Sequence, residues 1–149
     1  MPRISKHGIA LGLGALLLAP LAAQAADGMV KTSAGAAYIH RQGAKLPAQV
    51  GVALDAKDIL ETGADGAVGI TMQDNSRFSL GPNSRFVVED FAFDPHQNRL
   101  AFVGRVESGT LSFNSGDIGK LAPDRVRLTT PLGTIGLRGT ALLIQVPNR

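Results

Sequence analysis

Residues able to bind a metal ion or to act as a catalytic base are few in this chain of 149 residues, which contains no cysteine. Its three histidines, His7, His40 and His96, lie far apart, and none has a partner at the short spacing that zinc ligands require. We therefore expect His40 and His96 to be ordinary surface or half-buried residues, and we predict neither a metal site nor a cofactor.

Two pairs of neighbouring acidic residues raise the question of acid–base catalysis: Asp55 with Asp58, and Glu89 with Asp90. Glycoside hydrolysis needs two carboxylates that face one substrate, whereas neighbouring residues of a strand point to opposite faces. Serine, histidine and aspartate all occur, but no Gly-x-Ser-x-Gly elbow accompanies them. The sequence thus predicts a protein without catalytic residues, and a hydrolase is the least favoured alternative.

Side chains that could bind a ligand without catalysing a reaction are also few. Arg138 could meet an anionic ligand or partner, although a salt bridge or a contact with a turn carbonyl is the more ordinary expectation. Tryptophan is absent and Tyr38 is the one tyrosine, which disfavours an aromatic platform for sugars. The alternation along the chain instead predicts a core that contains most of the phenylalanines (Phe86, Phe91, Phe93, Phe102 and Phe113).

The first 25 residues have the three parts of a secretory signal peptide. Arg3 and Lys6 precede an uncharged run from Ile9 to Leu21, and Ala23-Gln24-Ala25 fits the small-x-small pattern of a cleavage site. The run is shorter than the roughly 20 apolar residues of a membrane span. We predict cleavage after Ala25, a periplasmic domain over residues 26–149, and no stable membrane span after cleavage.

Removal of residues 1–25 would change the charge. Arg3 and Lys6 are lost and no acid is lost, so the net charge falls from +3 to +1 (3 − 2). The remaining positive residues are scattered and form no basic stripe, which disfavours nucleic-acid binding. With no cysteine, the exported domain must rely on apolar burial and backbone pairing rather than on disulfides.

Short alternating segments run through the rest of the chain and predict an all-β fold. Val68, Ile70 and Met72 alternate with small or polar residues, and similar segments recur up to Leu142, Ile144 and Val146. A helix is conceivable over Val50 to Leu60, but Gly51 and the β-branched residues weaken it. The spacing of the strands leaves a sandwich, a barrel and a solenoid open. Tight hairpin turns are expected at Asp65-Gly66 and at Asp74-Asn75.

Several of these elements together resemble the FecR domain, a bacterial envelope module. The resemblance rests on their order: Leu54 to Gly63, then Asp65-Gly66, then Asp74-Asn75-Ser76, then Gly81-Pro82-Asn83-Ser84, then Gly104 to Gly109, and finally Thr130-Pro131-Leu132-Gly133 to Arg138-Gly139-Thr140. It implies a twisted β-solenoid or β-roll of short strands. The residues of these motifs are expected to serve the structure: Gly63, Asp65, Gly66, Asp74, Ser76, Gly81, Pro82, Ser84, Gly109, Thr130, Pro131, Gly133, Arg138, Gly139 and Thr140.

Turn chemistry explains why such residues recur. Glycines at turns and bulges reach backbone conformations closed to other residues, and Asp74 and Ser76 can close a hairpin through side-chain-to-backbone bonds. Asn75 stands where the family commonly has glycine, a mild change because asparagine also tolerates left-handed turns.

The C-terminal end departs more strongly from the pattern. Members of the family usually continue for two or three strands beyond Arg-Gly-Thr, whereas this chain stops at Arg149. We therefore expect Ala141 to Val146 to form an open edge strand of a domain truncated at its C-terminal strands, and such an edge predicts pairing with a partner or self-association.

The resemblance and the export signal together predict a non-enzymatic envelope module that binds a protein or relays a signal. The alternative is a module that binds a cell-wall component or an envelope polysaccharide. The partner itself is not identified by any motif of the chain.

Overall fold

The protein is described here by a computed structural model, which covers residues 24–138 and 141–148. Most of the expected signal peptide, together with Gly139 and Thr140 of the last motif, lies outside the described residues. Strands make up 59% of the structure and helices 9%. The all-β prediction is therefore confirmed.

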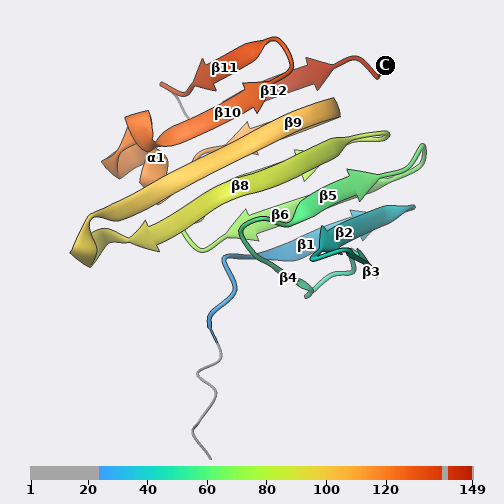
Figure 1. Cartoon of the computed structure of the whole chain (residues 1–149), viewed down its shortest axis with the longest axis horizontal. Coiled ribbons are helices and arrows are strands. Elements are labelled where there is room, and N and C mark those ends of the chain that lie inside the picture. The colour runs from blue at the N-terminus through green and yellow to red at the C-terminus, as the bar shows by residue number, and fades with distance from the viewer. Residues whose placement is uncertain (1–23, 139–140, 149) are drawn as a thin grey trace, which may run out of the picture.

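Twelve strands form one curled, half-barrel sheet (Figure 1). They are β1 (Gly28–Ala34), β2 (Ala37–Arg41), β3 (Ala44–Pro47), β4 (Ala53–Leu54), β5 (Ile59–Thr62), β6 (Ala67–Met72), β7 (Arg77–Leu80), β8 (Arg85–Asp94), β9 (Arg99–Asn114), β10 (Val126–Thr130), β11 (Gly133–Gly136) and β12 (Ala141–Val146). Three short helical segments accompany them: η1 (Pro95–Gln97), α1 (Asp117–Leu121) and η2 (Pro123–Arg125). The solenoid that the resemblance implied is not confirmed.

The long strand β9 joins the two halves of this sheet. Its first half pairs with β8 on one side and β10 on the other, and its second half pairs with β7 and β12. The sheet order is β3-β2-β5-β8-β9-β7-β6-β1-β4, so that β9 lies between the group β2, β5, β8 and the group β7, β6, β1. Figure 1 shows β8 and β9 running side by side across the molecule, with β10 and β11 beyond β9.

Only one of the two expected hairpins exists. Asp74-Asn75 connects β6 to β7, which pair antiparallel as predicted, and Asn75 has the positive φ of 63° that such a turn needs. Asp65-Gly66, by contrast, connects β5 to β6, and these strands lie in different halves of the sheet. The second hairpin was therefore a wrong prediction, since the chain crosses between the halves there instead of turning back on itself.

The core lies inside the curl and follows the predicted alternation. Val68, Ile70 and Met72 are buried, as are Leu111 and Phe113 on β9. Five phenylalanine rings are linked by contacts at its centre. Phe102 lies 4.9 Å from Phe113 and 6.0 Å from Phe91 between ring centroids. Edge-on contacts of this kind add to the stabilisation from burial alone. Phe93 is half-buried against the same core.

The short helix α1 was not predicted, and the segment proposed as a possible helix is not helical. Residues 50–60 contain a turn, the two-residue strand β4 and the start of β5. Helix α1 contains Gly119, which is a poor helix former. It forms because Ile118 is buried in the core and because its first N–H groups bond to a distant loop, as described next.

Candidate functional site

The turn between β6 and β7 holds a closed cluster of hydrogen bonds, here called the hairpin node. Asp74 and Ser76 are fully buried. The Asp74 carboxylate accepts from the Ser76 N–H at 3.0 Å, from the Ser76 hydroxyl at 2.7 Å and from the Ile118 N–H at 3.3 Å. The Ser76 hydroxyl oxygen also accepts from the Gly116 N–H at 2.9 Å. The polar groups of both residues are thus used to fix the turn and the start of α1.

A second cluster, the Thr62–Ser84 node, joins β5 and β9 to the loop between β7 and β8. The Thr62 hydroxyl donates to the Gly81 carbonyl at 2.6 Å and accepts from the Ser84 N–H at 2.9 Å. The Ser84 hydroxyl donates to the Pro82 carbonyl at 3.2 Å and accepts from the Thr110 N–H at 2.9 Å. This node closes the sheet where β9 passes from one half to the other.

Gly109 completes the Thr62–Ser84 node. Its φ is +82°, and a Cβ atom placed on it would lie 2.1 Å from the Ser84 Oγ. A side chain is therefore excluded both by backbone conformation and by space.

The loop between β5 and β6 packs against the loop that follows β1. The Gly63 N–H donates to the Ala36 carbonyl at 2.8 Å, and the Asp65 carboxylate accepts from the Ala36 N–H at 3.2 Å. A Cβ atom on Gly66 would lie 2.0 Å from the Ala36 oxygen. These glycines are thus required by close packing and not by a positive φ, whereas Gly81 has neither constraint.

The sequence reasoning missed a buried ion pair between Arg41 and Asp58. Asp58 is 2% exposed, and the Arg41 guanidinium donates to both of its oxygens, at 2.9 and 2.5 Å. A carboxylate oxygen of Asp55 lies 3.2 Å from a nitrogen of the same guanidinium. The hydrogen bond to Asp58 raises the pKa of Arg41 above its usual value. The expectation that Asp55 and Asp58 point apart was wrong, because the two residues flank a turn and not a strand.

Charged side chains on the outer face of β5, β8 and β9 form an ion ladder. Arg85 bonds to Glu61 and to Glu107, each at 2.7 Å, and Arg105 lies 2.9 Å from Glu89. Glu89 and Glu107 are the extra residues at two bulges of the β8–β9 pair, which is how they come to face their neighbours. Lys45 lies 3.7 Å from Glu61 and adds a third positive charge to the two arginines. Each of the three glutamates therefore has a basic partner within the fold.

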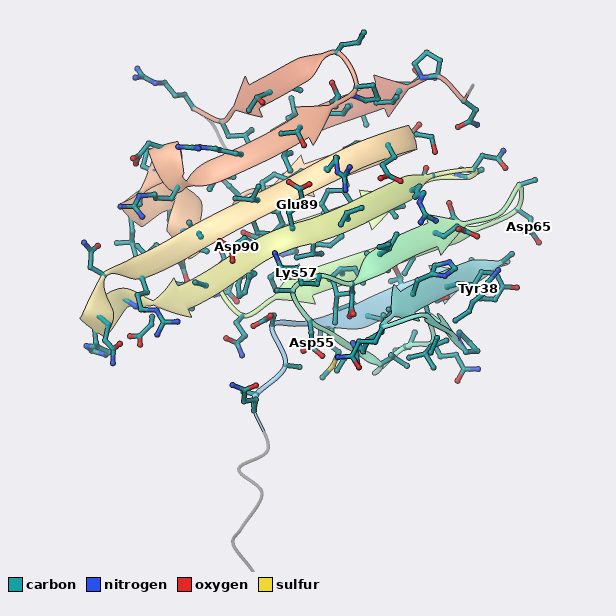
Figure 2. The ribbon with its side chains drawn as sticks, viewed as in Figure 1. Tyr38, Asp55, Lys57, Asp65, Glu89 and Asp90 are labelled. Atoms are coloured by element: carbon teal, nitrogen blue, oxygen red, sulfur yellow. The ribbon has the colours of Figure 1, made fainter. Side chains whose placement is uncertain are left out.

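Figure 2 shows Lys57, Glu89 and Asp90 close together over β8, whereas Asp65 lies apart at a loop end. The Lys57 ammonium donates to the backbone carbonyl of Glu89. This polar group therefore fastens the loop after β4 to β8 instead of facing a substrate.

The two histidines are separate in the structure as well. His96 is exposed in η1. The Nε2 of His40 lies 3.2 Å from the Glu61 carboxylate, but it is buried and has no partner in hydrogen-bond geometry. Among residues 24–138 and 141–148, no group of three His, Cys, Asp or Glu residues could hold a metal ion.

The last motif borders an apolar cavity of about 570 Å³, here called the C-terminal groove. Residues of the β10–β11 hairpin, of β12 and of β9 contribute to its walls. The residues that line it are Glu107, Ser108, Thr130, Pro131, Leu132, Ile135, Ile144, Gln145, Val146 and Pro147. The Thr130 hydroxyl accepts from the Leu132 N–H at 3.2 Å and donates to the Gly133 carbonyl, also at 3.2 Å. Leu132 is left 91% exposed at the tip of this turn.

A second cavity of about 770 Å³ lies on the other side of the same hairpin. Arg127, Arg138 and Asp124 are among the residues that line it. No hydrogen bond or ion pair joins Arg127 or Arg138 to another residue of the described part of the chain. Gly139 and Thr140, next to Arg138, lie outside that part, and the expectation for Arg138 stays a prediction.

The order of these motifs along one curled sheet agrees with a match to a known family. Residues 58–148 match the family model of the FecR protein. The chain belongs to the FecR family. The match begins at Asp58, so that Leu54 to Lys57 of the opening motif precede it, and it includes both nodes and the C-terminal groove. Membership of the FecR family suggests a signal-transduction or regulatory role.

Neither a curated protein nor a solved structure matches the chain. Among the described residues, no helix has the length and apolar character needed to span a membrane.

Proposed function

We propose that this FecR-family domain is a non-enzymatic periplasmic module that relays a signal by binding a protein along the C-terminal groove. The observation that carries the proposal is the contrast between the motif residues. Those of the two nodes use their polar groups on the fold itself, whereas Pro131 and Leu132 of the last motif are exposed beside an apolar cavity. Exposed apolar surface next to a concave groove is typical of a protein-binding site.

Export is supported by the tripartite N-terminal segment, and cleavage after Ala25 is compatible with the hydrogen bonds of Ala26 and Asp27. The Ala26 carbonyl accepts from the Gln73 side chain at 2.5 Å, and the Asp27 carbonyl accepts from the Gln73 N–H at 2.8 Å. Cleavage after Ala25 would thus remove no residue that takes part in these bonds. Mass spectrometry of the periplasmic fraction should find a chain that begins at Ala26. A chain that retains its first 25 residues in the membrane fraction would contradict export with cleavage.

The groove is tested by photo-crosslinking in living cells. A benzophenone amino acid replaces Leu132, and a matched control carries it at Val50, which is 64% exposed on the opposite side of the fold in the turn before β4. We expect a protein adduct at position 132 and none at position 50. Adducts at both positions, or at neither, would show that the groove is not a specific binding surface.

A second candidate function is the binding of an anionic envelope polysaccharide. The observation that favours it is the cavity lined by Arg127 and Arg138, whose guanidinium groups have no acidic partner in the described part of the chain. Replacement of both by glutamine should release the protein from sedimented cell-wall polysaccharide. Equal sedimentation of the wild type and the variant would reject this candidate.

A further inference from the structure

Four strands of the described chain have a hydrogen-bonded neighbour on one side: β3, β4, β11 and β12. Such edges expose unpaired backbone groups, and proteins usually protect them by shortness, proline or lysine. Strand β4 has two residues, and β3 contains Lys45 and Pro47. Strand β11 has four residues, with a glycine at each end. These three edges are poor templates for a further strand.

Strand β12 has none of these protections. It is six residues long, Ala141-Leu142-Leu143-Ile144-Gln145-Val146, and contains neither a charge nor a proline. It pairs in unbroken register with β9, from Ala141 opposite Asn114 to Val146 opposite Gly109, without a bulge. Its outer side therefore presents a straight row of donors and acceptors that no strand of the described chain occupies.

The C-terminal end of the fold carries two exposed apolar side chains. Leu132 and Leu143 are the two most exposed large hydrophobic side chains of the described residues, at 91% and 71%. Both belong to the C-terminal end of the fold, the first on the hairpin that walls the groove and the second on β12. A strand added to β12 would reduce the exposure of Leu143 and supply the missing backbone partners.

We infer that β12 pairs antiparallel with β12 of a second copy of this chain, about a two-fold axis perpendicular to the sheet. This inference rests on the proposed function, because it names the partner of the edge that borders the C-terminal groove. A two-fold axis brings each strand opposite itself, so that any charge on the strand would face an identical charge nearby. The absence of charge on β12 removes that repulsion, and the low net charge of +1 expected for residues 26–149 leaves little repulsion between whole molecules.

A second copy fits this edge better than a charged partner does. No charged residue lies between Ala141 and Pro147, and the one charged residue that lines the groove, Glu107, is already paired with Arg85 and Arg105. No unpaired charge near β12 could therefore attract a strand of a different protein. Every copy of the chain, by contrast, offers an apolar strand of equal length, namely β12 itself.

The test uses the full secreted chain in analytical ultracentrifugation. The wild type is expected to form dimers, and Leu143→Lys is expected to raise the dimer dissociation constant at least about tenfold, because two like charges then meet near the axis. Leu143→Glu should have the same effect. A mixture of the two variants should recover dimers, because opposite charges now meet. Circular dichroism checks that both variants fold, and Lys at Val50 is the control that should leave dimerisation unchanged.

The cysteine-free sequence allows a second measurement. Leu143→Cys should give a disulfide-linked dimer on oxidation, because facing residues of paired strands bring their Cβ atoms to about 4.5–5.5 Å. Val50→Cys should not. A short bis-maleimide linker extends the reach to a register shifted by two residues, the smallest shift that keeps the same side chains on the same face.

The results distinguish the two proposals. A wild-type monomer at every concentration, or a dimer that persists in Leu143→Lys, overturns the pairing of two β12 strands. If Leu132 still captures a different protein in cells, binding at the groove stands without self-association. If neither a homodimer nor a captured protein is found, both proposals fail.

Discussion

The hairpin node and the C-terminal groove are both built from motif residues of the FecR family, yet their environments are opposite. Asp74 and Ser76 are fully buried, and each oxygen of the Asp74 carboxylate accepts a hydrogen bond. In the groove, Thr130 bonds within its own turn and Leu132 faces solvent. Motif residues of one family therefore divide into those that hold the fold and those that the fold leaves available to a partner.

The largest expected loss of stability comes from a substitution in the buried hairpin node. Asp74→Ala removes the acceptor for the Ser76 N–H, the Ser76 hydroxyl and the Ile118 N–H. Buried donors without partners are costly, so the free energy of unfolding should fall by about 3 kcal/mol in urea denaturation.

Asp65→Ala is the matched control for Asp74→Ala, because Asp65 is also a motif aspartate but is exposed and accepts one bond. Asp65→Ala should lower the free energy of unfolding by less than about 1 kcal/mol. Equal losses for the two variants would contradict the division between buried and exposed motif residues.

The next effect concerns the Thr62–Ser84 node. Gly109→Ala places a Cβ atom against the Ser84 Oγ at a φ of +82°, and should lower the free energy of unfolding by about 2–3 kcal/mol. Gly136→Ala, whose Cβ would meet nothing within 4 Å, should change it by no more than about 0.5 kcal/mol. A tolerated Gly109→Ala would mean that the node can rearrange.

Two leucines four residues apart, Leu128 and Leu132, test whether the exposed motif residues serve binding and not stability. Leu132→Ala should leave the free energy of unfolding within about 0.5 kcal/mol of the wild type but abolish photo-crosslinking of the groove from a neighbouring probe at Pro131. The Leu128 side chain is fully buried, so that Leu128→Ala should lower the free energy of unfolding by about 3 kcal/mol. Loss of stability in Leu132→Ala would show that the hairpin tip supports the fold after all.

The smallest effect is a pH dependence at the N-terminal end of the domain. Burial is the main cause that raises the pKa of Asp27, helped by nearby Asp55, Asp58 and Asp90 and opposed by the hydrogen bond from the Ala56 N–H. Between the ordinary pKa and the raised one, the folded state binds the proton more tightly than the unfolded state does. Stability due to Asp27 is therefore lost as the pH rises through this window.

Asp27→Asn should remove that contribution and keep an acceptor for Ala56. Urea denaturation of the two proteins across the acidic range should show the wild type losing stability relative to the variant as the pH rises. If the two free energies of unfolding differ by the same amount at all pH values, the pKa of Asp27 is not raised.

Much of the strand pattern could be predicted because it depends on local alternation. The burial of Val68, Ile70 and Met72 follows from a period of two, and the Asp74-Asn75 hairpin follows from residues within the turn itself. The C-terminal strand was predicted as an edge strand, and β12 pairs with β9 alone in the described part of the chain.

The errors share a physical cause, which is contact between distant segments. Asp65-Gly66 has the residues of a hairpin turn, but β5 and β6 each find partners elsewhere, β2 and β8 for the first and β1 and β7 for the second. Helix α1 begins where Asp74 accepts from the Ile118 N–H, 44 residues along the chain. Arg41 and Asp58 come together only once β2 and β5 have paired. No local pattern carries such information.

The 16-residue strand β9 also determines when the two halves of the sheet can unite. Every strand from β1 to β8 is made before it, and the sheet order joins the group of β2, β5 and β8 to the group of β1, β6 and β7 through β9. A chain that emerges N-terminus first therefore carries two separate, unsealed half-sheets until residues 99–114 arrive. The export proposed above fits this order, because a chain that crosses a membrane unfolded cannot close its sheet before residues 99–114 have left.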